Sequence, residues 1–371
     1  MPARGDNRVK RPGRGVVHME ELIEVLQRHK ARYPQATAVD LVKLVYQSEF
    51  GPGHFITDEG ASLARLEEEC RSLQTDGVED ELFEPIGRGL VRLHLRALPP
   101  GVSLFTVNRF FVLTAQKVRG SREGLRGKLE VLREFLQGDE QDLAFLEEYE
   151  KAGCPQLSHS PSFRAAYAPA YRVVQREFAL FFPVFREIEG LLRGEQPVVV
   201  AIDGRSGSGK SSLARLLQEV YGCSVISMDH FFLRPEQRTP ARLQQPGGNV
   251  DHERFQEEVA PNLRSGKAFR YRMFNCRDGS FTPSPVIEPG PLTVVEGCYS
   301  LHPALGELYD LKVFLTVPPE VQRERILKRS GPVMLRRFVE EWIPLEELYF
   351  SSFRIEEQSQ IRICTTRPDL D

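Results

Sequence analysis

One stretch near the middle of the chain limits the possible folds more than any other. Residues 198–217 read VVVAIDGRSGSGKSSLARLL. An apolar, β-branched run ends at Asp203, three of the next six residues are glycine, and a helical pattern begins near Lys210. Glycine adopts backbone conformations that other residues avoid, so the chain can bend tightly here and turn successive N–H groups inward. The pattern therefore predicts a buried strand, a tight loop and a helix in direct succession.

The loop fits the phosphate-binding pattern G-x-x-x-x-G-K-[ST] in full. Inward-facing amides and the positive end of the following helix together suit the oxygens of a phosphate chain. We expect Lys210 to neutralise the β- and γ-phosphates and the Ser211 hydroxyl to ligate Mg²⁺. The expected nucleotide-binding residues are Gly204, Arg205, Ser206, Gly207, Ser208, Gly209, Lys210, Ser211 and Ser212. ATP and Mg²⁺ are the expected cofactors, although nothing in the sequence separates ATP from GTP.

The residue pattern changes near Glu195, and the first residues have a composition of their own. Three parts of the chain are therefore predicted. Residues 1–15 are basic and rich in glycine and proline, and we expect no fixed structure there. Residues 16–193 are mainly helical in pattern, and residues 194–371 alternate short β-branched runs with helical segments. Such alternation is typical of a parallel sheet. The predicted fold is an α/β P-loop NTPase domain, a parallel sheet with flanking helices, preceded by a mainly α-helical domain.

Two segments of the helical part are predicted individually. GLVRLHLRAL alternates strictly and predicts one short strand, with Arg92, His94 and Arg96 most simply on its solvent-facing side. YRVVQREFALFFPVFREIEGLLRG, residues 171–194, predicts a long helix with a kink at Pro183.

The composition of the chain limits the classes of partner that it is expected to bind. The formal net charge is −3 and 41% of residues are hydrophobic, so neither a nucleic-acid surface nor a membrane surface is expected. No apolar run approaches the roughly 20 residues of a membrane span, and the beginning of the sequence has no apolar signal-peptide core. The six cysteines are scattered without a C-x-x-C pair, as in reduced proteins. We expect a cytoplasmic chain with a small-molecule partner, and homo-oligomerisation stays open.

Four further positions favour phosphoryl transfer over a nucleotide switch. Asp229 ends the next strand pattern, where a carboxylate can orient an acceptor hydroxyl and take its proton. Glu296 follows an apolar strand and can hold Mg²⁺ directly or through water. Arg325 and Arg329 are four residues apart on one helix face, where a lid could stabilise the transferring charge. Each position also has a plain structural explanation, as a turn, a cap or a solvated helix face.

The order of these pieces resembles the uridine kinase family, within the group that includes phosphoribulokinase and pantothenate kinase. The matching segments are GRSGSGKSS, SMDHFF, GGNVDHERF, VVEGCYSLH and DLKVFLTVPPEVQRERILKRSG, spread over residues 197–364. The resemblance implies an ATP-dependent kinase that phosphorylates a hydroxyl of a nucleoside or related sugar. By the same resemblance Asp229 is the catalytic base, Lys210, Arg325 and Arg329 assist the transfer, and Asp251, Tyr271 and Arg277 bind the acceptor.

The acceptor segment departs from the family. Tyr271 is followed by Arg272 instead of aspartate, and Cys276 stands near the position of a histidine. An acceptor other than uridine, including one that carries negative charge, is therefore open. The alternative function is a nucleotide-dependent regulatory or assembly ATPase whose helical half binds a partner. A bifunctional protein is a third possibility.

The helical half contains polar residues within mostly apolar sequence segments. They are His54, Arg92, His94, Asn108, Arg109, His159, Tyr167 and Tyr171. In the simpler interpretation His54 is a spacer in a tight turn, and the strand residues Arg92 and His94 lie on a solvent-exposed face. The alternative hypothesis gathers these groups into an anion-binding pocket.

Overall fold

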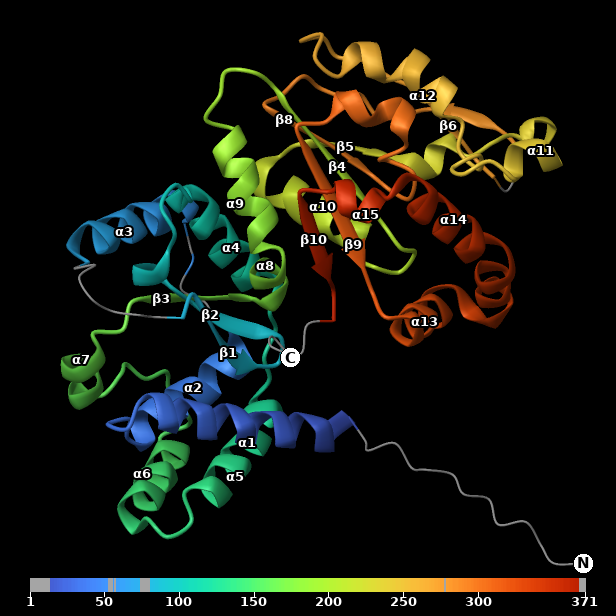
Figure 1. Ribbon diagram of the computed structural model, residues 1–371. Coiled ribbons are helices and arrows are strands. Elements are labelled where there is room, and N and C mark those ends of the chain that lie inside the picture. The colour runs from blue at the N-terminus through green and yellow to red at the C-terminus, as the bar shows by residue number, and fades with distance from the viewer. Residues whose placement is uncertain (1–13, 53–55, 57, 74–80, 277, 367–371) are drawn as a thin grey trace, which may run out of the picture. The chain divides into compact units, whose positions relative to one another are not determined.

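The protein divides into two compact units. The computed structural model describes residues 14–52, 56, 58–73, 81–276 and 278–366, with side chains from residue 20 onward (Figure 1). The first unit takes the described residues of Met1–Pro99 and Val107–Ala179, and the second takes those of Pro100–Thr106 and Leu180–Asp371. Each unit has its own apolar core. Most of the predicted unstructured segment, residues 1–13, lies outside the described residues.

The first unit is mainly helical and contains one small sheet. Its elements are α1 (Arg14–Arg32), α2 (Ala38–Phe50), α3 (Glu59–Ser72), β1 (Phe83–Gly87), β2 (Leu90–His94), the 3₁₀ turn η2 (Leu95–Ala97), most of α4 (Leu104–Lys117), α5 (Arg122–Phe135), α6 (Glu140–Lys151), α7 (Pro161–Tyr167), β3 (Tyr171–Gln175) and most of α8 (Arg176–Leu180). Apolar faces of α1, α2, α5 and α6 form its core with Ile86, Leu90 and Val173 of the sheet.

The small sheet corrects two expectations. Its order is β1-β2-β3, and both pairs are antiparallel. The strand predicted in GLVRLHLRAL is present as β2, but all five of its residues are buried, so the solvent-facing placement of Arg92 and His94 is wrong. The long helix predicted from residue 171 is also wrong, because Tyr171–Gln175 pairs with β2 before the chain turns into α8 and then α9.

The second unit is an α/β layer structure. Its regular elements are α9 (Phe182–Leu191), β4 (Val198–Gly204), α10 (Lys210–Tyr221), β5 (Ser224–Ser227), α11 (Pro240–Leu243), α12 (His252–Glu258), β6 (Arg272–Phe274), β7 (Phe281–Pro283), β8 (Leu292–Glu296), β9 (Leu311–Thr316), α13 (Pro319–Arg337), α14 (Ile343–Phe353), α15 (Ile355–Gln358) and β10 (Ile361–Cys364). The 3₁₀ turns are η3 (Met228–Phe231), η4 (Pro235–Gln237), η5 (Ala260–Asn262) and η6 (Pro303–Leu308), and η7 (Phe338–Trp342) is a π-helical turn.

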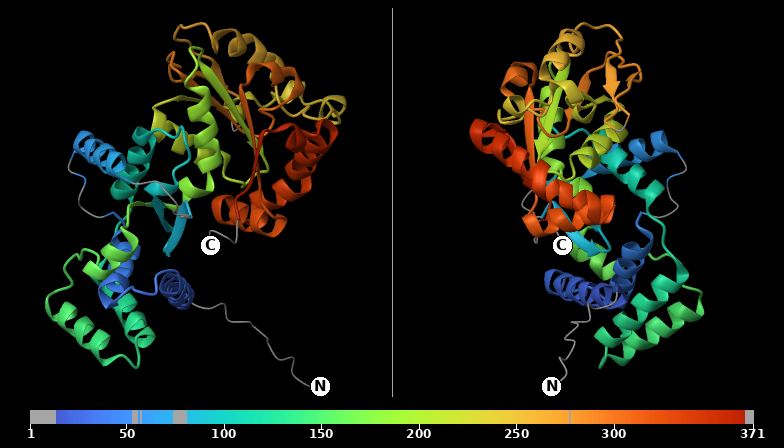
Figure 2. Two further views of the ribbon diagram at one scale, coloured as in Figure 1. Left: turned by 60° about the vertical axis from the view of Figure 1, so that its left-hand side comes forward. Right: turned by 90° about the vertical axis from the view of Figure 1, so that its right-hand side faces the viewer.

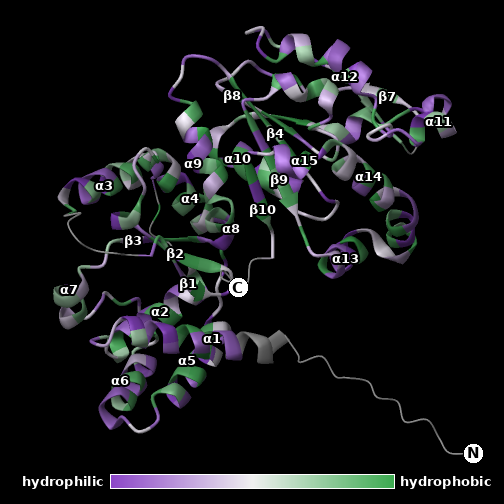
Figure 3. Ribbon diagram, viewed as in Figure 1, coloured by the Kyte–Doolittle hydropathy of each residue, from purple (hydrophilic) through white to green (hydrophobic). Residues whose placement is uncertain are grey.

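Five parallel strands form the main sheet in the order β10-β9-β4-β8-β5. All residues of β4 and β8 are buried, as expected for central strands covered on both faces by helices. The helices flank this sheet in the views of Figures 1 and 2. Figure 3 shows the strands as mostly hydrophobic, whereas α11 and α13 carry many hydrophilic residues. The predicted α/β P-loop fold, preceded by a mainly helical part, is confirmed.

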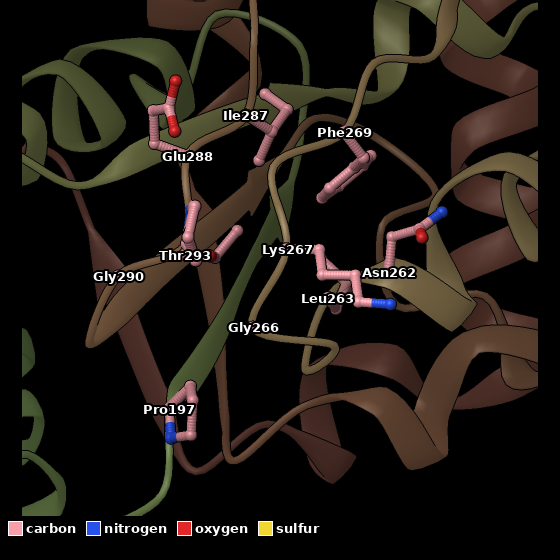
Figure 4. Close-up of a pocket in the computed structure, with 11 residues that line it drawn as sticks. Pro197, Asn262, Leu263, Gly266, Lys267, Phe269, Ile287, Glu288, Gly290 and Thr293 are labelled. Atoms are coloured by element: carbon pink, nitrogen blue, oxygen red, sulfur yellow. The ribbon is translucent and has the colours of Figure 1, made fainter.

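A pocket lies at the edge of the sheet where β4 and β8 begin. Pro197 directly precedes β4 and Thr293 is the second residue of β8, and both line the pocket with Asn262, Lys267 and Glu288 (Figure 4). The phosphate loop follows the opposite end of β4, so this pocket is separate from the predicted nucleotide site. No helix in the described ranges combines the length and the apolar content needed to cross a bilayer.

Candidate active site

The phosphate loop joins the carboxyl end of β4 to the first turn of α10. Gly204, Gly207 and Gly209 all have positive φ, at 136°, 77° and 99°. A Cβ atom on Gly204 would lie 2.0 Å from the carbonyl oxygen of Leu315 on β9, so no larger residue fits without moving backbone. The Lys210 ammonium donates to the carbonyl oxygens of Gly204 and Arg205 at 2.7 and 3.1 Å. The lysine is therefore held over the loop that its motif predicts.

Two glutamates of α14 hold the phosphate loop from outside. The buried Glu346 carboxylate accepts the backbone N–H of Ser206 at 3.0 Å and also the Ser206 hydroxyl. Its neighbour Glu347 accepts two hydrogen bonds from the Arg205 guanidinium, at 2.8 and 3.1 Å. Burial raises the pKa of Glu346 above its usual value, although the charge of Lys210 and the Ser206 hydrogen bonds oppose this.

Glu346 is a site residue that the sequence patterns did not predict. Its signal is an acidic residue that shares an apolar helix face with Tyr349 and Phe350, three and four positions further on. The contact partner lies 140 residues earlier in the chain, so no local pattern identifies it.

Polar groups at the ends of neighbouring strands gather beside the loop. The Glu296 carboxylate ends β8 and accepts the hydroxyls of Ser211 at 3.0 Å and Ser227 at 2.8 Å. The Ser227 hydroxyl in turn accepts the N–H of Asp229 at 3.4 Å, and the Asp229 side chain is exposed. The parallel register of β4, β8 and β5 brings Ser211, Glu296 and Asp229 to one edge.

The donor set of Ser211 and Glu296 suits magnesium. Mg²⁺ keeps several waters and is usually bound through one or two carboxylates together with substrate phosphates. In the described part of the chain no group of three or more His, Cys, Asp or Glu residues forms a metal site. One carboxylate and one hydroxyl beside a phosphate loop meet the requirement of a cation that arrives with its nucleotide.

The predicted acceptor residues lie beyond Asp229. Asp251 caps α12 through the N–H of Arg254 at 3.1 Å and also accepts Gln237 Nε2 at 3.1 Å. The buried Tyr271 hydroxyl bonds to Nδ1 of His230 at 2.9 Å, and burial raises the pKa of Tyr271 to about 12. Its ring stacks on Phe231 at 5.2 Å. Arg277, the third predicted acceptor residue, lies outside the described residues.

The arginine that replaces the family's aspartate has a partner within the chain. Arg272 Nε donates to Glu258 Oε1 at 2.7 Å, and the Arg272 backbone N–H donates to Glu258 Oε2 at 2.7 Å. This ion pair compensates the charge of Arg272. The sequence argument for a negatively charged acceptor therefore loses its main support.

The two predicted lid arginines differ in their surroundings. Arg325 Nη1 donates to the carbonyl oxygen of Gly207 at 3.1 Å and to Thr365 Oγ1 at 2.7 Å, which ties α13 to the phosphate loop. Arg329 is exposed and its Nε donates to the neighbouring Ser330 Oγ at 3.3 Å. Two residues later Gly331 breaks the helical conformation with φ 79°, directly before Pro332. Arg325 is thus fixed against the loop, and Arg329 lies next to a kink.

In the first unit, the structure brings together four of the polar residues singled out from the sequence. Arg92 lies over the ring of Tyr171 at 4.5 Å, and the Tyr171 hydroxyl bonds to Nε2 of His159 at 2.7 Å. His94 joins them through Glu84, which contacts both Arg92 and His94. The other residues bind elsewhere: Asn108 pairs with Ser62, Arg109 with Glu59, and the Tyr167 hydroxyl accepts the N–H of Gln35. His54 lies outside the described residues.

Fold and site together define a P-loop nucleotide-binding unit, and comparisons with known proteins add a family resemblance. Residues 199–331 match the model of the phosphoribulokinase/uridine kinase family. The family resemblance inferred from the motifs is confirmed for this part of the chain.

Individual relatives are distant and cover less than half of this chain. The chain is 29% identical over 144 residues to a uridine kinase of Geobacillus kaustophilus, covering 37% of this chain and 67% of the relative. It is 28% identical over 136 residues to the phosphoribulokinase of Synechocystis sp., covering 34% of this chain and 40% of the relative. A solved structure described as a possible uridine kinase from Bacillus stearothermophilus matches with a TM-score of 0.38 and 15% identity, covering 49% of this chain and 99% of that one. The chain spans 40% of the phosphoribulokinase and 67% of the uridine kinase, so the comparisons show a similarity to these kinases over part of their length.

Proposed function

We propose that residues 194–371 transfer the terminal phosphate of ATP to a hydroxyl of a small molecule, a nucleoside or related sugar. The observation that carries the proposal is the placement of one exposed carboxylate, Asp229, beside the phosphate loop. Asp229 follows the strand next to β8, and Ser227 links it to Glu296 and so to Ser211. A nucleotide switch needs the loop and a cation site, whereas only phosphoryl transfer to an alcohol also needs a base.

Each group of the site has a role in this reaction. The loop amides and the Lys210 ammonium hold the phosphates in line with the acceptor hydroxyl. Asp229 orients that hydroxyl and takes its proton as the bond to phosphorus forms. Ser211 and Glu296 would hold Mg²⁺, which when bound would supply positive charge beside the phosphates. Arg325 stabilises the developing negative charge from the loop side, and Arg329 completes the lid. Such catalysis consists mainly of positioning and electrostatic stabilisation.

The acceptor side of the proposal rests on Asp251 and Tyr271. Asp251 is buried and already accepts two hydrogen bonds, and its remaining lone pairs suit vicinal sugar hydroxyls. The Tyr271 ring is buried against Phe231, so Tyr271 takes part in the acceptor side through its hydroxyl, which bonds to His230. The proposal assigns no step of the transfer to the first compact unit, the described residues of Met1–Pro99 and Val107–Ala179.

The test is an assay of ADP release with Mg-ATP and a panel of nucleosides, sugars and vitamins. One acceptor should raise the rate of ADP release well above hydrolysis in its absence. The Asp229→Asn variant should lose about 10²- to 10⁴-fold in acceptor-dependent turnover, because a positioned base contributes a factor of that size. Its affinity for ATP should stay unchanged. Lys210→Ala should lose ATP binding itself. An Asp229→Asn enzyme that turns over at the wild-type rate would leave the alternative of a regulatory ATPase.

A further inference from the structure

The first unit buries a network of charged and polar side chains that the proposed kinase reaction does not use. It lies where α2 faces β1, β2 and β3 and where the chain enters α7 (Figure 1). Its centre is Arg92, of which 1% is exposed. A charge at that depth needs compensation from its surroundings. The way in which the network distributes its hydrogen bonds shows what kind of group it lacks.

The two carboxylates of the network are fully occupied. Glu84 accepts from His29 Nδ1 at 2.8 Å, His94 Nε2 at 3.0 Å, the Tyr33 hydroxyl at 3.3 Å and Arg92 Nη1 at 3.4 Å. Burial alone would raise the pKa of Glu84, but the charge of Arg92 and the histidine hydrogen bonds bring it well below its usual value.

Asp40 is occupied in the same way. It accepts His159 Nδ1 at 2.8 Å, the Ser160 N–H at 3.0 Å, the Ser160 hydroxyl at 2.7 Å and the Thr37 N–H at 3.1 Å. These carboxylates therefore act as fixed acceptors and have little capacity left for a further donor.

The occupied carboxylates also orient the groups around them. Because His159 Nδ1 faces Asp40, its Nε2 faces the Tyr171 hydroxyl at 2.7 Å. Gln47 Oε1 accepts Arg92 Nε at 3.2 Å and Nη2 at 2.9 Å. The amide NH₂ group of Gln47 must therefore point away from Arg92, and it has two hydrogens to donate.

One lysine beside this network has no carboxylate partner. Lys43 Nζ donates to the carbonyl oxygen of Leu157 at 2.9 Å, and the described part of the chain places no ion pair on it. Burial, together with the charge of Arg92, lowers the pKa of Lys43 to about 8, and Asp40 only partly opposes this. Lys43 and Gln47 are four residues apart and so share one face of α2. Both are half-buried, so this face is reachable from solvent.

We propose that Lys43, Gln47 and Arg92 form a binding site for an oxyanion, the phosphate or carboxylate group of a small molecule. At Lys43 and Gln47 the hydrogen-bonding capacity that is left consists of donors, so a ligand at this face of α2 must bring acceptors. Arg92 already pairs with Glu84, whereas Lys43 has no ion-pair partner in the described part of the chain, so a ligand group with negative charge is the one that fits beside Lys43. Lys43 and Gln47 contact the ligand from α2, and the positive charge of the buried Arg92 stabilises the ligand from β2. This site is independent of the proposed kinase reaction.

The test follows two lysines in one NMR spectrum of the full chain. Lysines are labelled with ¹³C at Cε, and the resonances of Lys43 and Lys128 are assigned from Lys43→Arg and Lys128→Arg variants. Lys128 is the matched control: burial lowers its pKa to about 8 as well, but its ammonium already pairs with Glu49 at 3.2 Å. Titrations of pH are run in sodium chloride, sodium acetate and sodium phosphate at equal ionic strength.

The expected result is selective. Phosphate should raise the titration midpoint of Lys43 by about one pH unit or more, since an adjacent anion favours the ammonium form, while Lys128 stays in place. A response to phosphate alone identifies a phosphoryl group, and a response to acetate as well identifies a carboxylate. The Gln47→Glu variant, which supplies an internal anion, should raise the Lys43 midpoint in chloride and remove its response to phosphate. The proposal is wrong if Lys43 titrates identically in all three salts, or if Lys43 and Lys128 shift equally.

Discussion

Replacement of Gly204 by alanine tests whether the phosphate loop has the shape described. At φ 136° the backbone conformation is strained for any other residue, which costs about 1–3 kcal/mol. The added Cβ would also lie 2.0 Å from the carbonyl oxygen and 2.7 Å from the nitrogen of Leu315. These are backbone atoms of a central strand, and forced displacement in a packed interior costs about 1–3 kcal/mol more. Gly204→Ala should therefore lower the free energy of unfolding by about 2–6 kcal/mol in total.

A substitution at a second glycine serves as the control, because it adds the same kind of backbone strain without a close contact. Gly222 ends α10 with φ 66°, and nothing lies within 4 Å of a Cβ placed there. Gly222→Ala should therefore lose only the cost of the left-handed conformation, about 1–2 kcal/mol. The assay is urea denaturation followed by the fluorescence of Trp342, the only tryptophan of the chain. Trp342 packs on Phe338 in η7, so its signal reports the second unit alone.

The comparison also has a functional readout. Gly204→Ala should bind ATP more weakly than Gly222→Ala, because only the first substitution displaces the loop from β9. An equal or smaller loss of stability in Gly204→Ala than in Gly222→Ala would show that β4 and β9 do not approach each other as described, and the argument for the loop would fail.

Three further outcomes follow from the contacts in both units. Ser211→Ala should raise the Mg²⁺ concentration needed for tight ADP binding by about tenfold or more, as measured by calorimetry at several Mg²⁺ concentrations, and an unchanged requirement would contradict the cation site. Arg325→Gln should weaken ADP binding more than Arg329→Gln, since only Arg325 holds Gly207 and Thr365; equal affinities would contradict this. Asp40 is buried, which alone would raise its pKa, yet hydrogen bonds from His159 and Ser160 lower the pKa below its usual 3.8. Its stabilising contribution is therefore present above about pH 4 and is lost as the pH falls below that value. Asp40→Asn should be less stable at pH 7 and should show a weaker loss of helical circular dichroism between pH 4 and pH 2; an acid transition like that of the wild type would contradict the assignment.

The phosphate loop and its strand could be predicted because their signals are local. Three glycines, a lysine and a serine at fixed spacing between a strand and a helix define the loop without knowledge of distant residues. The central strands β4 and β8 could be predicted for the same reason, since buried parallel strands leave continuous apolar runs. Glu346, in contrast, becomes visible only when α14 packs against the loop.

The first unit contains features that local sequence signals could not predict. The five residues of β3 contain an apolar pair that fits a helix and a strand equally well, and only pairing with β2 decides between them. The alternation of apolar and polar residues along β2 indicated a solvent-exposed face, because charged side chains usually face solvent. Arg92 and His94 are buried instead because Glu84, on the neighbouring strand, pairs with both. A single sequence does not reveal that partnership.

The nucleotide loop is completed by residues that lie near the end of the sequence. Glu346 and Glu347 hold its first turn, and Thr365, just after β10, anchors the arginine that grips Gly207. During translation, residues 204–211 leave the ribosome long before any of these partners exist. A nascent chain that has not yet reached α14 therefore carries the phosphate-binding sequence without the scaffold that fixes it. Recognition of ATP should appear abruptly once α14 and Thr365 have been synthesised, after the first unit has had time to fold.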